Sequence, residues 1–225
     1  MIRLGVLASG GGTNLQMILD ACAARRIDAE VAVVISNVPT AGALDRARRA
    51  GVEAVVVPSK GVADREAYDL QLVEALRARR VDLVCLAGYM RIVTPAFLRA
   101  FGPSPATRGC PRVVNVHPGL LPSFPGLHAQ RQCVAYGARF AGCTVHFVDE
   151  GTDTGPVIVQ AVVPVVPGDT EERLAARILE QEHRLYPQAI QWFAQGRLSV
   201  AGRAVTVDGA GPPAPGPLVN PAVEI

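Results

Sequence analysis

The sequence predicts an α/β fold with a doubly wound, mostly parallel, Rossmann-like sheet that carries helices on both faces. Short apolar runs typical of buried strands alternate with longer amphipathic segments typical of helices through the first half of the chain. The run at 2–8 passes directly into glycines, a frequent transition between a strand and a helix in such folds. This alternation favours a parallel sheet with right-handed crossovers.

Each element is assigned from its own pattern. Strands are expected at 2–8, 30–35, 52–57 and 81–87, then from 113, at 143–148 and over 156–166. Helices are expected at about 15–25, 41–50 and 63–80. A short helix should begin at 95, another should end at about 137, and the last should begin at about 171. The last helix should run to about Tyr186, with Pro187 as a candidate break before Trp192. A hairpin is expected over 197–207.

Composition indicates one globular domain over 1–208 and a flexible Pro- and Gly-rich tail over 209–225. Of the 225 residues, 49% are apolar and 19% charged, which suffices for a sizeable core. A net charge of +2 with scattered arginines argues against a nucleic-acid surface, and no apolar run is long enough to span a membrane. Five cysteines without CxxC spacing and the lack of a signal peptide favour free thiols in the cytoplasm. The chain is expected to act on small molecules as a monomer or a homodimer.

A glycine-rich turn follows the first strand, at Ser9-Gly10-Gly11-Gly12-Thr13-Asn14. Glycines allow backbone N–H groups to approach an anion closely, and the following helix N-terminus adds a favourable dipole. The pattern is neither GxGxxG nor a Walker loop, so a phosphate monoester fits better than a dinucleotide. The alternative is a tight turn in which Thr13 or Asn14 merely caps the helix.

A second polar group gathers around the strand that begins at 113. Asn115 and His117 are two residues apart and share one face, and His146 and Asp153 follow at the next predicted strand and loop. An amide, imidazoles and a carboxylate suit addition to a carbonyl, with donors for an oxyanion and a group that moves protons. The alternative is a core histidine bonded to the backbone. A metal site is the weaker interpretation because no HxxxH or comparable spacing occurs. We therefore expect no metal ion in this site.

Several motifs in the same order resemble the phosphoribosylglycinamide formyltransferase family of the formyltransferase superfamily, over about residues 2–199. They are SGGGTNLQ at 9–16, LAGYMRI at 86–92, NVHP at 115–118, LPSFPGLH at 121–128 and DTGP at 153–156. The resemblance implies a formyltransferase fold. It also implies transfer of a formyl group from the co-substrate 10-formyltetrahydrofolate to the amine of glycinamide ribonucleotide in purine biosynthesis, without a metal.

The resemblance further implies three groups of site residues. Asn115, His117 and Asp153 match the catalytic trio. The residues matching the ribonucleotide site, with the phosphate on backbone groups, are Gly11, Gly12, Thr13, Asn14 and Glu182. Those matching the folate pocket are Arg65, Met90, Arg91, Ile92, Val93, Glu150, Gly151, Thr152 and Thr154.

The sequence departs from the family pattern at two places. The loop at 101–111 is longer than the family's usual link, and Leu179 stands where the family often has a polar phosphate contact.

Three alternative functions remain. Methionyl-tRNA formyltransferase shares the catalytic motif but would require a basic second domain. Formyltetrahydrofolate hydrolase would carry an additional N-terminal domain. A non-catalytic module that senses a phosphorylated metabolite is the third alternative, and the intact trio speaks against it.

Overall fold

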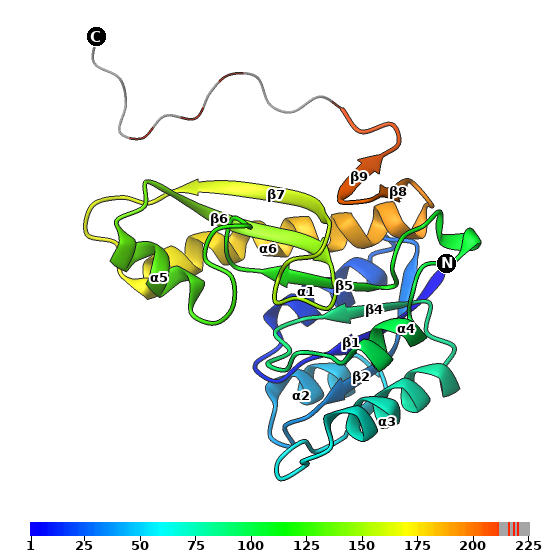
Figure 1. Cartoon of the computed structure of the whole chain (residues 1–225). Helices are drawn as coiled ribbons and strands as arrows, with labels where there is room; N and C mark the ends of the chain where they lie inside the picture. The colour runs from blue at the N-terminus through cyan, green and yellow to red at the C-terminus, as the bar shows by residue number, and fades with distance from the viewer. Residues whose placement is uncertain (212–215, 217, 219, 221–225) are drawn as a thin grey trace.

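A seven-stranded mixed sheet in the order β3-β2-β1-β4-β5-β6-β7 lies at the centre of the fold (Figure 1). The computed structural model describes residues 1–211, 216, 218 and 220. The strands are β1 (Ile2–Leu7), β2 (Ala29–Ser36), β3 (Ala54–Val56), β4 (Leu83–Leu86), β5 (Val113–His117), β6 (Phe140–Phe147) and β7 (Val157–Pro164). β1 to β5 pair in parallel, and β6 and β7 add antiparallel pairs at one edge. The predicted mostly parallel sheet is confirmed.

Helices cover both faces of this sheet, as predicted. They are α1 (Thr13–Ala23), α2 (Gly42–Arg49), α3 (Arg65–Ala78), α4 (Pro95–Ala100), α5 (Ala129–Tyr136) and α6 (Glu171–Ala194). Buried residues of α1, α2 and α6 join one core cluster, and those of α3 and α4 join a second cluster with the opposite side chains of the strands. A third cluster packs α5 and the first half of α6 against β6 and β7. The alternating apolar side chains of the central strands therefore fill a core on each face.

The strand order reverses between β1 and β4, and the glycine-rich turn lies at this point. β1 is followed along the chain by β2 on one side and neighbours β4 on the other. The turn is tied to the segment after β4, because the backbone N–H of Ser9 donates to the Gly88 carbonyl (3.0 Å). The N–H of Met90 in turn donates to the Ser9 hydroxyl oxygen (2.8 Å). Ligands of open α/β sheets bind at such reversal points.

Helix α6 passes through Pro187 without a break, contrary to the prediction of an interruption there. It is one continuous helix of 24 residues. Proline removes one backbone hydrogen bond, but the adjoining residues are held on the sheet. The Tyr186 hydroxyl donates to the carbonyl oxygens of Leu86 (2.9 Å) and Val114 (3.2 Å), and Ile190 is buried in the same core cluster. Packing of this face outweighs the local cost of the proline.

The other differences lie at element ends. β6 begins at Phe140 rather than at 143, because its ladder with β7 extends to the pair Phe140–Pro164. The 101–111 loop contains a 3₁₀ turn, η1 (Pro105–Thr107). The terminal hairpin is confirmed as β8 (Leu198–Ala201) and β9 (Ala204–Val207). Most of the predicted tail, at 212–215, 217, 219 and 221–225, lies outside the described residues.

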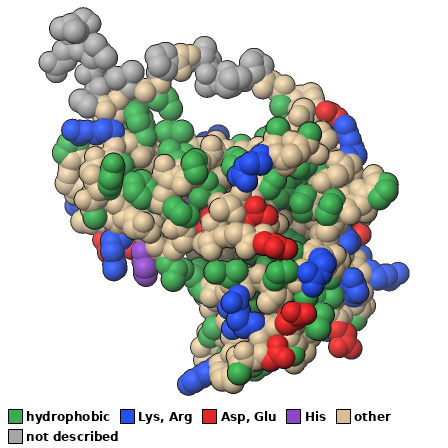
Figure 2. All heavy atoms as spheres, in the orientation of Figure 1, with side chains coloured by type: hydrophobic (Ala, Val, Ile, Leu, Met, Phe, Trp, Pro, Cys, Tyr) green, Lys and Arg blue, Asp and Glu red, His purple; other side chains and the backbone are tan. Residues whose placement is uncertain are grey.

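The described surface carries charges of both signs. Figure 2 shows Lys and Arg side chains spread over the visible face and interspersed with acidic ones. No helix within the described residues is long and apolar enough to cross a membrane. All five cysteines are free thiols, as predicted. Cys85 is fully buried.

Candidate active site

The polar face of β5 forms the centre of the candidate site. Asn115 and His117 project from the same side of the strand, as predicted from their spacing. In the antiparallel ladder, His146 of β6 lies opposite Asn115, and Thr144 lies opposite His117. Asn115 lies within the ladder, since it also pairs with Leu86 of β4. The site is therefore built on the face of the sheet rather than only beyond the end of the strand.

The carboxylate of Asp153 returns from the turn between β6 and β7 and lies over this face. Its Oδ2 atom is 3.3 Å from Nδ1 of His117, and its Oδ1 atom is 3.6 Å from Nε2 of His146. The Asn115 amide nitrogen also approaches Oδ1, at 3.5 Å. The backbone N–H of Gly126 donates to Oδ2 at 2.8 Å. The structure thus brings together Asn115, His117 and Asp153, which are separated along the chain.

The ring of His117 is almost fully buried and held at both nitrogens. Nε2 lies 2.9 Å from the carbonyl oxygen of Phe124, so Nε2 carries a hydrogen and donates it. A further proton on the ring must therefore go to Nδ1, the atom that faces Asp153. Burial lowers the pKa of His117 more than the Asp153 carboxylate and the Phe124 carbonyl raise it.

Asp153 keeps its charge at neutral pH. Burial alone would raise the pKa of its carboxyl, but the neighbouring His146 ring, the Gly126 N–H and the His117 ring together lower it overall. Its backbone φ of 55° is a left-handed conformation that is uncommon for residues other than glycine. The flanking Gly155 packs so tightly that an added Cβ would lie 1.8 Å from the Phe147 carbonyl oxygen. Backbone packing therefore fixes the position of the carboxylate.

His146 completes this group, although the sequence resemblance assigned it no role. Its Nδ1 atom lies 2.8 Å from the Phe147 carbonyl oxygen and therefore carries a hydrogen. Its Nε2 atom lies 3.2 Å from the Asn115 amide nitrogen, which is a donor, and so accepts a hydrogen bond from it. His146 is thus able to fix the orientation of the Asn115 amide. The shared strand face of Thr144 and His146 was the sequence signal for this placement.

The glycine-rich turn presents backbone donors at the start of α1. Gly12 is the N-cap residue with φ 73°, and no side chain caps the helix. Neither Thr13 nor Asn14 acts as the cap, contrary to the capping role that was the alternative for these two residues. In the described part of the chain, the backbone N–H groups of Gly11, Gly12, Thr13 and Asn14 have no hydrogen-bond acceptor. Such a row of free N–H groups is able to bind an anion.

Glu182 of α6 lies beside this turn, far from it along the chain. Its Oε2 atom accepts a hydrogen bond from the Asn14 amide nitrogen at 2.6 Å. Glu182 is buried, and this burial raises the pKa of its carboxyl despite the bond from Asn14. The Oδ1 atom of Asn14 is buried and has no hydrogen-bond partner among the residues that the structure describes. The Asn14 Oδ1 atom is therefore an acceptor that is available to a ligand beside the free N–H groups of the turn.

The residues matched to the folate pocket lie in two segments. In the first, Arg65 donates to the Ile92 carbonyl (2.8 Å), and the Arg91 guanidinium stacks on the Tyr68 ring at 4.4 Å. Met90 and Ile92 are exposed, whereas Val93 is buried. The second segment is the turn with Glu150, Gly151, Thr152 and Thr154, all exposed. No hydrogen bond joins the two segments within the described residues.

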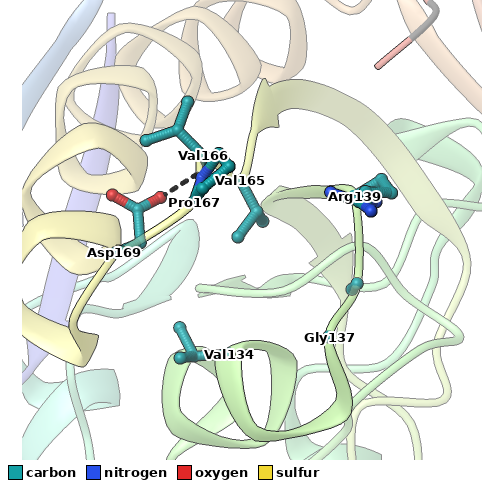
Figure 3. A pocket seen from close by; sticks show the side chains of 9 residues that line it. Val134, Gly137, Arg139, Val165, Val166, Pro167 and Asp169 are labelled. Atoms are coloured by element: carbon teal, nitrogen blue, oxygen red, sulfur yellow. Dashed lines mark hydrogen bonds between the residues drawn. The ribbon is translucent and has the colours of Figure 1, made fainter. Parts of the chain in front are cut away.

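A separate cavity of about 180 Å³ offers no comparable chemistry. It lies between α5, the loop after β7 and the start of α6 (Figure 3). Its carboxylate, Asp169, accepts from the Val166 N–H (2.9 Å) and is paired with Arg177 (2.8 Å). Within the described residues, no group of three or more His, Cys, Asp or Glu side chains is arranged to hold a metal ion.

The chain is similar to known proteins over most of its length. The formyl transferase family model matches residues 2–190. Phosphoribosylglycinamide formyltransferase of Escherichia coli is 44% identical over 208 residues, which cover 92% of this chain and 94% of that protein. The crystal structure of glycinamide ribonucleotide transformylase 1 from Symbiobacterium toebii has a TM-score of 0.86 at 56% identity, covering 92% of this chain and 94% of that one.

The match also extends to larger proteins. The trifunctional purine biosynthetic protein adenosine-3 of Drosophila melanogaster is 48% identical over 196 residues. The matched region is 86% of this chain but only 14% of that protein.

Proposed function

We propose that this chain, which belongs to the formyl transferase family, transfers the formyl group of 10-formyltetrahydrofolate to the amine of glycinamide ribonucleotide. The products are formylglycinamide ribonucleotide and tetrahydrofolate, in the synthesis of purines. The proposal is supported by the full-length similarity to phosphoribosylglycinamide formyltransferase. The observation that carries it is the convergence of Asn115, His117 and Asp153 on one face of β5.

The turn at 9–14 is the proposed site of the substrate phosphate. The N–H groups of Gly11, Gly12, Thr13 and Asn14 are available to a phosphate oxygen, and the dipole of α1 favours its negative charge. Glu182 would accept hydrogen bonds from the ribose or the glycinamide. The substrate would thereby extend from the strand reversal point toward β5.

The segments 90–93 and 150–154 are proposed to bind the folate. Backbone N–H and carbonyl groups of such segments can pair with the edge of a flat heterocycle, while Met90 and Ile92 supply apolar contact. Arg65 would meet the carboxylates of the glutamyl tail. Folate and ribonucleotide would then meet over β5, because Ser9 ties the turn at 9–14 to the segment after β4.

The chemistry follows from the hydrogen bonds of the trio. The amine attacks the formyl carbon, and negative charge develops on the formyl oxygen. The Nε2–H of His117, which here meets the Phe124 carbonyl, would turn to this oxygen, and Asn115 would donate a second hydrogen bond. Asp153 remains on Nδ1 of His117 and would take up the proton that the amine releases, directly or through water. The same proton would pass to N10 of the folate as the bond between the formyl carbon and N10 breaks, which releases tetrahydrofolate.

The proposal is tested with purified protein, 10-formyltetrahydrofolate and glycinamide ribonucleotide, by following the change in folate absorbance. We expect transfer that depends on both substrates. Glycinamide without the ribose phosphate is the control acceptor and should react far more slowly, because it cannot occupy the turn at 9–14. Absence of transfer to the ribonucleotide by folded protein would contradict the proposed function.

A further inference from the structure

Helix α2 holds the glycine-rich turn through two consecutive carbonyl groups. The backbone N–H of Ala43 donates to the Gly10 carbonyl oxygen at 3.1 Å. One turn further along α2, Nε of Arg46 donates to the Gly11 carbonyl oxygen at 2.7 Å. Both carbonyl groups are therefore turned toward α2.

Peptide geometry carries this orientation to the opposite side of the turn. In a trans peptide, the carbonyl oxygen of one residue and the N–H of the next point in opposite directions. Holding the Gly10 and Gly11 carbonyls on α2 therefore aims the N–H groups of Gly11 and Gly12 away from it. These are among the N–H groups that have no acceptor within the described residues.

The Arg46 side chain is itself held in place. Its Nη1 atom donates to Oε1 of Gln16 at 3.0 Å, and the Gln16 N–H donates to the Gly12 carbonyl at 3.0 Å. The guanidinium thus bridges the turn and the first turn of α1, and its side chain is only partly exposed. A planar guanidinium can make both contacts at once, whereas a lysine ammonium is a single flexible point charge.

We infer that Arg46 is a positioning residue for the phosphate of the ribonucleotide, acting through the Gly11 carbonyl rather than by touching the phosphate. The inference rests on the proposed function, because it assumes that the turn at 9–14 binds that phosphate. Its distinctive consequence is that Arg46 affects binding of the phosphorylated substrate and leaves folate binding unchanged.

The experiment compares Arg46→Met with Arg48→Met, which removes the same charge from the same helix. Arg48 pairs with Asp45 and makes no contact with the turn in the described structure. Arg46→Met should raise KM for the ribonucleotide about tenfold, with kcat within about twofold, as expected for one lost charged hydrogen bond. The affinity for inorganic phosphate, measured by calorimetry, should fall to a similar extent. Arg48→Met should leave both quantities at the wild-type values.

Two further variants cover the case in which Arg46→Met does not fold. Gln16→Leu removes the partner of the guanidinium and should raise KM for the ribonucleotide less than Arg46→Met. Arg46→Lys keeps the charge without the double contact, and its KM should stay above the wild-type value. A wild-type KM in Arg46→Lys, or equal effects in Arg46→Met and Arg48→Met, would overturn the inference. Failure of the proposed function would differ, since wild-type protein would then transfer no formyl group while phosphate binding would still report on Arg46.

Discussion

The Nδ1 atom of His117 faces the Oδ2 atom of Asp153 at 3.3 Å, while the other ring nitrogen is committed to the Phe124 carbonyl. A proton that enters this pair therefore lies between the imidazole and the carboxylate. The two groups must titrate as a coupled unit rather than as two independent residues. The decrease of kcat toward low pH should accordingly follow the titration of the pair rather than the titration of one residue.

Removing the charge of Asp153 tests this unit directly. Asp153→Asn keeps the size of the side chain but cannot accept the proton, so kcat and kcat/KM should fall together by on the order of 10²-fold. His117→Asn should be similarly impaired, and the double variant should be little worse than either single one. Steady-state kinetics give these values, and circular dichroism confirms folding. Near-full kcat in folded Asp153→Asn would require another group to move the proton.

The lowered pKa of His117 predicts that folding stability decreases in mild acid. The folded state binds fewer protons than the unfolded state below the ordinary histidine pKa of 6.5, so stability is lost as the pH falls through that value. His183 contributes with the same sign, since burial also lowers its pKa. Asp153 contributes only at lower pH, below its ordinary 3.8.

His117→Asn should therefore lose less thermal stability than the wild-type protein between about pH 7 and about pH 5. His128→Asn is the matched control, because the His128 side chain is 62% exposed. Melting temperatures measured across this range decide the point. Equal pH dependence in the wild-type protein and His117→Asn would mean that another group is responsible.

The glycines of the turn should separate binding from stability. An added Cβ at Gly11 meets nothing within 4 Å, whereas at Gly12 it would lie 2.9 Å from the Ala43 Cα atom, at a φ of 73°. Gly11→Ala should fold normally and raise KM for the ribonucleotide. Gly12→Val should raise KM as well, but it should also lower the free energy of unfolding by about 1–3 kcal/mol because of backbone strain. Urea unfolding and KM values for both variants check this, and an unchanged KM in both would place the phosphate elsewhere.

The Tyr186 hydroxyl should contribute to stability through its two carbonyl partners on β4 and β5. Tyr186→Phe removes a donor from a fully buried site and should cost about 1–3 kcal/mol in the free energy of unfolding. Tyr136→Phe is the control, since that ring is 80% exposed and the change should be near neutral. Chemical unfolding of both variants measures the difference, and equal stabilities would show that the buried hydroxyl contributes little.

The sequence predicted the strand–helix alternation because each element carries its own periodic pattern. It predicted the shared face of Asn115 and His117 for the same reason. The roles of the Phe124 carbonyl and the Gly126 N–H were missed, because backbone groups of a loop leave no side-chain signal. Phe124 and Asp153 adopt positive φ values although neither is glycine, which local propensity does not foretell. The continuous helix through Pro187 likewise depends on tertiary packing.

Asn115 and His117 belong to a strand that is hydrogen-bonded on both sides, and the Tyr186 hydroxyl bridges that strand to its parallel neighbour. Local opening of these two residues would require separation of the central strands, so they belong to the same cooperative unfolding unit as the core. The carboxylate of Asp153 is held from outside this ladder, by the Gly126 N–H and by the close packing of Gly155 on Phe147. Substrate entry is therefore expected to leave the backbone of Asn115, His117 and Asp153 in place.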